Sequence, residues 1–453
     1  MSSLWGTGEP SRFWWRIHDR DAPDPLADGG GWWRIGEEGF QEPEERFGGY
    51  NAWLNGTAPA WSDDLLRVAR AVFLADKLVR RDLAFDSWTR QMLVSVPVSE
   101  PAIWESATYS LLRPLLQTLT ADEWDLRFRE LEPGYVQEPF AAPWEPAQEV
   151  SLFSGGLDSL SWAARRAAVS DGPLALVTFG EGSLKPLQQR AHQAVQRVSR
   201  KHHNRELRPI WRNRNPNGKD EIDGKDGRVV ESSSRPRGLL YASTAVRIAA
   251  AEGVGTVNVP ENGLLALNPP LSPARPAALS TRSVHPRTLY LLNQLIGTIG
   301  GAVRVENPLQ SCAKGAACAE ARRVGLSAAE LEDSVSCGGP PTRLRGAPYN
   351  NCGTCYPCLI RRASLLHANE YDGTDYEAEP WHADQSTDRT RHWNALQRWL
   401  DGPFTTLDLY ADLPLPPGAD ARRLVEVVES GREELRALVR SGLDAGRAGR
   451  TSN

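Results

Sequence analysis

The stretch Glu149-Val-Ser-Leu-Phe-Ser-Gly-Gly-Leu-Asp-Ser159 decides the fold of this 453-residue chain. Its apolar run from Val150 to Phe153 predicts a buried strand, and a helical spacing of apolar residues begins near Ser159. Two glycines between strand and helix let the backbone turn tightly. Such a turn points free N–H groups and a helix N-terminus at one place, which predicts a site for phosphate.

The composition of the chain indicates a multidomain protein of ordinary polarity. Its length predicts two or three domains, and its net charge of −5 argues against a broad nucleic-acid-binding surface. No apolar run approaches the roughly 20 residues of a membrane span, and the first residues lack the features of a signal peptide. We therefore expect a cytoplasmic protein without membrane contact. In that compartment the six cysteines suggest metal binding or chemistry rather than disulfides.

Residues 1–145 hold 11 of the 16 tryptophans and predict a small α+β domain. The expected elements are a helix capped by Ser62 and reaching Arg81, a strand over 92–98, a helix over 104–119 and a strand over 124–128. The tryptophans are expected in its core, because large aromatic side chains are mostly buried. The region contains no catalytic constellation. Residues 139–146 are expected to form a linker.

From Glu149 onward, predicted strands alternate with predicted helices. The expected strands are Val150–Phe153, Leu174–Phe179, Leu207–Trp211, Thr256–Pro260 and Ala302–Glu306. This alternation predicts a doubly wound parallel α/β sheet with helices on both faces. Ligands of such sheets bind beyond the carboxyl ends of the strands, so the loops after Phe153, Phe179 and Pro260 should face one crevice. The polar stretch 213–235 is a candidate lid.

A cluster of cysteines follows this region. It comprises Cys337, Cys352, Cys355 and Cys358. Three cysteines with two-residue gaps and a fourth further upstream are typical of a tetrahedral structural zinc site. A [4Fe–4S] cluster is the alternative, because ferredoxins use the same short gaps. Cys312 and Cys318 have no partner at ligand spacing and are interpreted as buried thiols.

The turn resembles the PP-loop of the ATP pyrophosphatase superfamily, also called adenine nucleotide α-hydrolase-like. The matching residues are Ser154, Gly155, Gly156, Leu157, Asp158 and Ser159. Further features resemble one branch, the 7-cyano-7-deazaguanine synthases or QueC family. They are Arg237-Gly-Leu-Leu opening a helix, Asn307-Pro-Leu followed by Lys314, and the four cysteines followed by Arg361 and Arg362. The resemblance covers roughly residues 148–370.

Two departures distinguish the chain from the short enzymes of that family. The segment from Pro260 to Pro286 is an insertion, and Lys314 lacks the acidic residue that commonly follows it. The insertion and the N-terminal region resemble the longer QueC-like proteins of the anti-phage Qat and CBASS systems. This resemblance implies three parts: a docking domain over 1–145, a PP-loop catalytic domain with its zinc site over 146–370, and a helical extension over 371–453. The apolar spacing from Leu424 to Val439 predicts a closing helix, with Gly431 as a potential break.

The resemblance also implies a reaction. ATP would adenylate the carboxylate of 7-carboxy-7-deazaguanine and release pyrophosphate. Ammonia would then give an amide and, with a second ATP, the nitrile. In a defence system the attacking amine could instead belong to a protein partner encoded in the same operon. The cofactors implied are ATP, Mg²⁺ and Zn²⁺.

Specific residues follow from this implied reaction. ATP would contact residues 154–159 and Phe179. Asp158 and Ser159 would take part in catalysis together with Lys314 and Arg237, although Arg237 could equally be a surface charge. The candidate substrate contacts are Glu261, Asn262, Arg282, His285 and Arg361. Those in the insertion would equally serve as caps of loops or helices.

Two other classes of function stay open at this level. A scaffold subunit could keep the nucleotide-binding fold without catalysis, although the retained Asp158 favours an enzyme. A PP-loop enzyme that modifies tRNA is a further alternative. The acidic net charge, and the lack of a cysteine near the nucleotide loop, argue against it.

Overall fold

The computed structural model describes residues 10–16, 32–36, 40, 56–132, 145–180, 184–203, 207–212, 231, 233–271, 282–338, 343–344, 347–348, 351–382 and 390–451. Most of the predicted linker and most of the predicted lid lie outside these ranges. The described residues form two compact units. Unit 1 takes residues 1–150, 211–258 and 281–306; unit 2 takes 151–210, 259–280 and 307–453. Each unit is described separately, and the proposed division into three parts stays a prediction.

Unit 1 contains a four-stranded sheet with strand order β2-β1-β3-β4. Its strands are β1 (Ser11–Arg16), β2 (Trp32–Gly36), β3 (Gln91–Val98) and β4 (Glu123–Glu130). All three pairings are parallel, with Phe13 opposite both Trp33 and Val94. A parallel sheet needs crossover connections, so this region is α/β in character where the sequence predicted α+β. The sequence pattern also missed β1 and β2.

The helices of the N-terminal region begin earlier than predicted. They are α2 (Ala60–Leu78), α3 (Pro101–Ala107) and α4 (Arg113–Thr120), with a π-helical turn, η5 (Thr108–Leu112), joining the last two. The sequence predicted Ser62 as the N-cap of α2, and this prediction is wrong: Pro59 holds that position. The Ser62 hydroxyl instead donates to the Pro59 carbonyl over 2.7 Å. Pro59 has no side-chain acceptor, so a sequence rule based on polar caps misplaced this helix start.

The described part of unit 1 also contains two later helices and two short strands. They are α8 (Arg237–Glu252), β8 (Thr256–Asn258), α10 (Pro286–Thr298) and β9 (Arg304–Glu306). Helix α2 packs against α8, and Arg247 on α8 forms an ion pair with Asp63 on α2. Arg81 and Arg90 both pair with the buried carboxylate of Asp122. Residues far apart in sequence therefore share one core.

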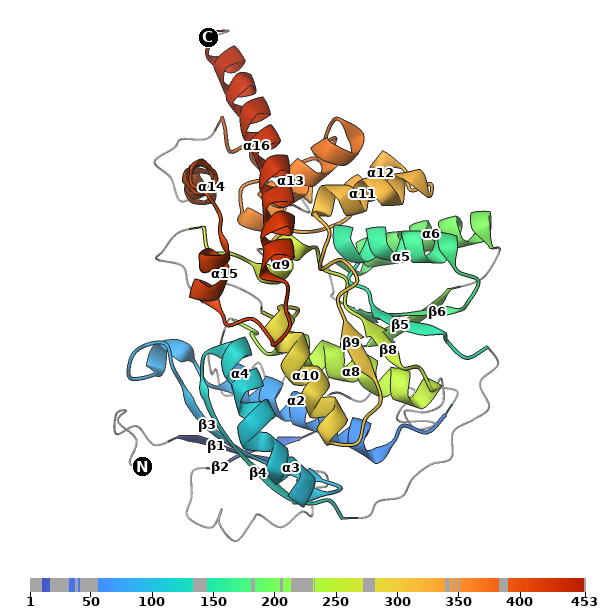
Figure 1. The fold of residues 1–453 in the computed structure, drawn as a ribbon, viewed down its shortest axis with the longest axis vertical. Helices are drawn as coiled ribbons and strands as arrows, with labels where there is room; N and C mark the ends of the chain where they lie inside the picture. The colour runs from blue at the N-terminus through green and yellow to red at the C-terminus, as the bar shows by residue number, and fades with distance from the viewer. Residues whose placement is uncertain are drawn as a thin grey trace. The chain divides into compact units, whose positions relative to one another are not determined.

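Unit 2 begins with the strand and helix that the opening stretch predicts. Its first elements are β5 (Glu149–Leu152), α5 (Leu157–Val169), β6 (Leu174–Phe179), α6 (Lys185–His202) and β7 (Arg208–Arg212). These strands belong to a five-stranded sheet with the order β7-β6-β5-β8-β9. Helices α5 and α6 lie side by side (Figure 1) and share an apolar core with β6. The predicted order of elements is confirmed here.

The rest of unit 2 is mainly helical. It contains α9 (Gly263–Leu267), α11 (Lys314–Arg323), α12 (Ala328–Glu332), a hairpin of β10 (Arg343–Leu344) and β11 (Ala347–Pro348), α13 (Tyr356–Asn369), α14 (Arg391–Asp401), α15 (Thr406–Asp412) and α16 (Ala421–Thr451). Gly431 does not break the last helix, because α16 runs through it. A second apolar core joins α9 and α13 to the helices that follow. Among the described helices, none is both long and apolar enough to cross a membrane.

Candidate active site

The turn between β5 and α5 has the geometry of an anion-binding loop. Gly155 has a φ of +75°, a conformation that favours glycine. Gly156 stands at the N-cap position of α5, and glycine has no side chain to accept from the first-turn N–H groups. A helix start without a side-chain cap is suited to binding an anion. The hydroxyl oxygens of Ser154 and Ser159 lie 3.2 Å apart beside the same turn.

Helix α6 and strand β6 support this loop from behind. The Gln188 amide donates to the carbonyls of Phe179 and Ser154 over 3.0 and 3.4 Å. Thr178 donates to the carbonyl of Phe153 over 2.9 Å, and its hydroxyl lies 2.8 Å from Nε2 of His192. Burial lowers the pKa of His192 to about 4, so its ring is neutral near pH 7. Phe153, the residue before the loop, is thus held by Thr178, which in turn contacts His192.

An ion pair lies at the start of α5. The Asp158 carboxylate and the Lys314 ammonium are 2.8 Å apart, and both side chains are at least nine-tenths buried. The buried amide of Asn262 donates to both oxygens of Asp158 over 3.3 and 3.2 Å. The structure therefore brings together Asp158 of the loop, Asn262 of the insertion and Lys314, which follows the Asn307-Pro-Leu motif. All three belong to unit 2.

Glu261 adds a second carboxyl group to this cluster. Burial and the neighbouring Asp158 carboxylate raise the pKa of Glu261 well above its usual range, against the effect of Lys314. Burial alone would lower the pKa of Lys314, but the Asp158 and Glu261 carboxylates outweigh it and raise that pKa. Asn307 fixes the backbone of Glu261 by accepting from its N–H and donating to its carbonyl, over 3.1 and 2.7 Å. The cluster thus places one cation beside two carboxyl groups.

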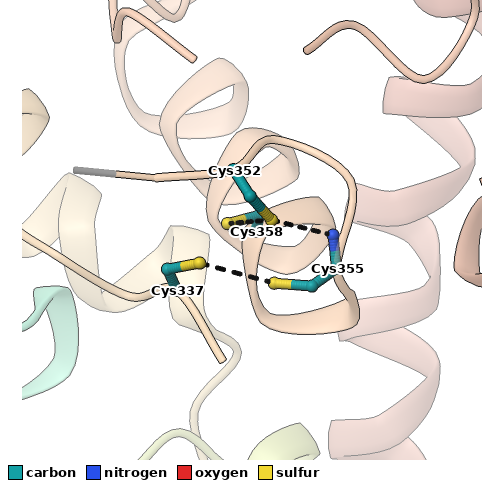
Figure 2. A group of neighbouring side chains, drawn as sticks. All are labelled: Cys337, Cys352, Cys355 and Cys358. Carbon is teal, nitrogen blue, oxygen red and sulfur yellow. Dashed lines mark hydrogen bonds between the residues drawn. The ribbon is translucent and has the colours of Figure 1, made fainter. Parts of the chain in front are cut away.

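The four predicted cysteines meet at one point (Figure 2). Their sulfur atoms all lie within 4.8 Å of one another, with 4.0 Å between Cys337 and Cys355 and 3.8 Å between Cys352 and Cys358. Four sulfurs at about 2.3 Å from a central tetrahedral ion are roughly 3.8 Å apart. The residues therefore fit a single ion such as zinc. A four-iron cluster is larger and would hold the sulfurs further apart.

The segment that leads into Cys337 connects the cysteine cluster to the loop. Asn351, which precedes Cys352, accepts from the Ser336 N–H over 3.1 Å and donates to the Ser334 carbonyl over 3.3 Å. A Cβ placed on Gly156 would lie only 3.0 Å from the carbonyl oxygen of Val335. Glycine at this position therefore lets the segment pass close over the loop.

The structure places the remaining predicted site residues elsewhere in the two units. Arg361 is fully buried and donates to the Ser334 hydroxyl and to the Leu331 and Glu332 carbonyls. Its described contacts thus hold the segment before Cys337. Phe179 is buried at the end of β6. Arg237, Arg282 and His285 belong to unit 1.

Two of those unit 1 residues lie at helix starts. Arg237 is the first residue of α8. His285 caps α10 by accepting from the Arg287 N–H over 3.2 Å, and burial lowers its pKa to about 4. The capping alternative for His285 is therefore realised. The oxygen of Asn262 likewise caps α9, while its nitrogen donates to Asp158; its contact with a substrate stays a prediction.

Sequence reasoning missed several polar residues that support the site. Gln188 and His192 lie one turn apart on the inner face of α6, so polar residues on an otherwise apolar face were the available signal. Glu434 lies on the last helix, is buried and accepts from the Gly315 N–H over 3.0 Å. The helical spacing was the available signal, because Glu434 lies seven positions after Val427 on the apolar face, whereas its neighbour Glu433 is exposed.

Comparison with known proteins finds a partial relative. A segment of 81 residues is 41% identical to the 7-cyano-7-deazaguanine synthase of Novosphingobium aromaticivorans. Part of this chain is related to that synthase. The matched segment is 18% of this chain, and the chain spans only 31% of the length of that relative. No protein-family profile matches the chain.

Proposed function

We propose that this protein is an ATP-dependent, AMP- and pyrophosphate-forming enzyme that activates a carboxylate on a 7-deazaguanine and transfers it to an amine. The observation that carries the proposal is the Asp158–Lys314 pair, buried at the start of the helix that the Gly155–Gly156 turn opens. A helix start with free N–H groups suits phosphate, and a buried lysine beside it supplies positive charge. The partial match to a 7-cyano-7-deazaguanine synthase supports the choice of substrate class.

The proposed reaction has two steps. A carboxylate oxygen attacks the α-phosphorus of ATP, the bond from that phosphorus to the β-phosphate oxygen breaks, and pyrophosphate leaves. An amine nitrogen then attacks the acyl carbon, AMP leaves with the electron pair of the broken C–O bond, and the amine loses a proton. Adenylation is needed because a carboxylate oxygen is a poor leaving group, whereas AMP is a good one.

Named residues would carry each part of this chemistry. The N–H groups after Gly156 and the hydroxyls of Ser154 and Ser159 would bind the departing phosphates. Lys314 would stabilise the charge that develops on them, because fixed charges in a buried site act strongly in the transition state. Mg²⁺ carried by ATP would neutralise further charge, and Asp158 offers the carboxylate oxygen that this ion prefers. The cysteines would hold a structural zinc ion.

The acceptor amine defines the biological role. Ammonia would lead to an amide or nitrile, whereas an amine of a protein partner would give a conjugated protein. The resemblance of the insertion and the N-terminal region to longer QueC-like proteins supports the second acceptor and a role in anti-phage defence. Unit 1 would then be the surface that receives the partner.

The test is to incubate the full chain with ATP, Mg²⁺ and 7-carboxy-7-deazaguanine, and to separate the nucleotides by chromatography. We expect AMP and pyrophosphate in equal amounts, dependent on the deazaguanine. Mass spectrometry of small-molecule products, and of proteins encoded beside this chain, would identify the acceptor. Release of ADP and phosphate, or no turnover by folded, metal-loaded protein, would contradict the proposal.

A further inference from the structure

One face of the C-terminal helix α16 consists of three residues that pack against other segments of unit 2. Val427, Gly431 and Glu434 are spaced four and three positions apart, so they lie on the same side of the helix. All three are buried. We call them the bracing face. Two of the segments that they touch carry Asn262 and Lys314, the residues that bind Asp158.

The first segment is the start of α9. A Cβ placed on Gly263 would overlap the Val427 side chain, and a Cβ placed on Gly431 would lie 2.8 Å from Leu264 Cδ2. Helices α9 and α16 therefore meet at two glycines with no space between them. Asn262, which caps α9 and donates to Asp158, directly precedes this contact. Its position thus depends on where α16 lies.

The second segment is the start of α11. The Glu434 carboxylate accepts from the Gly315 N–H over 3.0 Å, and the Ser364 hydroxyl lies 3.5 Å from the same oxygen. A Cβ on Gly315 would lie 2.5 Å from the other oxygen of Glu434. Lys314 is the first residue of α11. A carboxylate at a helix N-terminus stabilises that end, so Glu434 fixes the backbone from which Lys314 reaches Asp158.

We propose that Glu434 is a positioning residue for Lys314, and that the bracing face of α16 holds both partners of Asp158 in place. This inference rests on the proposed function, because it assigns to the C-terminal extension a part in the same site. Lys314 and Asn262 approach Asp158 from two separate segments. Gly263 donates to the Cys312 carbonyl over 2.9 Å, which ties these segments to each other. The bracing face then fixes both against one helix.

Kinetics of matched variants test the positioning role. Glu434→Ala should lower kcat for AMP formation by at least about tenfold, the equivalent of one lost hydrogen bond to a charged group. KM for ATP should change little, because the loop itself is intact. Glu434→Gln keeps an acceptor for the Gly315 N–H and should recover most of kcat. Glu433→Ala alters the exposed neighbour on the same helix and should behave as wild type.

A second measurement does not depend on activity. The full chain is treated with an amine-acylating reagent, and the rate of labelling of Lys314 is followed by peptide mass spectrometry. Buried and paired with Asp158, Lys314 should be protected in wild type and Glu433→Ala. In Glu434→Ala its labelling should be at least about tenfold faster, because the helix start is released. If Glu434→Ala does not fold, Gly315→Ala displaces the same carboxylate and should give the same result.

The outcomes separate this inference from the proposed function. Faster labelling of Lys314 without any AMP formation by wild type would support the bracing role and contradict the proposed function. AMP formation by wild type with unchanged kcat and unchanged labelling in both Glu434→Ala and Gly315→Ala would overturn the bracing role alone. Equal losses in Glu434→Ala and Glu434→Gln would also overturn it, because the acceptor would then not matter.

Discussion

The Asp158 carboxylate and the Lys314 ammonium lie 2.8 Å apart in the interior of unit 2, one from the glycine turn and the other from the start of a distant helix. A buried ion pair costs desolvation energy for both partners. Stability alone therefore gives little reason for an ion pair at the N-terminus of α5. The pair places the Lys314 charge beside the loop. Asp158, a residue of the loop motif itself, holds that charge in place.

Removing one member of this pair should destabilise the fold as well as stop the reaction. Asp158→Asn removes the carboxylate that pairs directly with the buried Lys314 and leaves only the Glu261 carboxyl group near it, so the free energy of unfolding should fall by about 3 kcal/mol. The double variant Asp158→Asn/Lys314→Met should recover most of this loss and stay inactive in AMP formation. Urea titrations and nucleotide assays measure the two effects. A double variant as unstable as Asp158→Asn would show that the pairing is not the cause.

Metal analysis should find about one zinc ion per chain, since four thiolates complete its tetrahedral shell. Cys355→Ser should lower both the zinc content and the melting temperature, because a structural metal contributes folding energy. Cys312→Ser changes a thiol outside the cluster and is the control for zinc content. Stoichiometric iron and a brown chromophore in protein purified without oxygen would show a [4Fe–4S] cluster instead.

Stability should fall in mild acid because His192 is buried in its neutral form. The unfolded chain takes up the proton near pH 6.5, whereas the folded chain does so only near pH 4. Proton uptake between these values therefore favours unfolding, by at most about 3 kcal/mol. His192→Gln should remove about one proton from the pH dependence of unfolding in this range. Urea titrations between pH 4 and 7 measure this dependence, and an unchanged slope in His192→Gln would contradict the assignment.

A chain that begins at residue 146 should be insoluble. Unit 1 combines the N-terminal helix α2 with the later helix α8, and Asp63 pairs with Arg247 across them. Removing residues 1–145 would expose the apolar side of α8, and large exposed apolar patches lead to aggregation. Size-exclusion chromatography after expression measures the outcome. A soluble, monomeric and folded truncation would show that residues 1–145 form an independent domain, as the sequence had suggested.

Local patterns predicted those parts of the fold whose signals are local. The alternation of strands and helices from Glu149 to Phe179 is confirmed, because apolar runs and a glycine turn mark each boundary. The cysteine cluster is confirmed as a spatial group. Three of its members stand at two-residue gaps, and Cys337 lies fifteen positions before Cys352. Strands β1 and β2 were missed, since two short strands in a sequence rich in Gly, Pro and Trp leave little periodicity to detect.

The sequence by itself determined the glycine turn, its strand and helix, and the thiols that meet near it. Only the tertiary structure decided that Asn262 and Lys314 share Asp158, and that Glu434 supports the start of the lysine's helix. Local conformation depends on neighbouring residues, whose spacing can be read directly. A buried charge depends on which distant segments fold around it, because its cost is offset only by partners that the chain brings together in three dimensions.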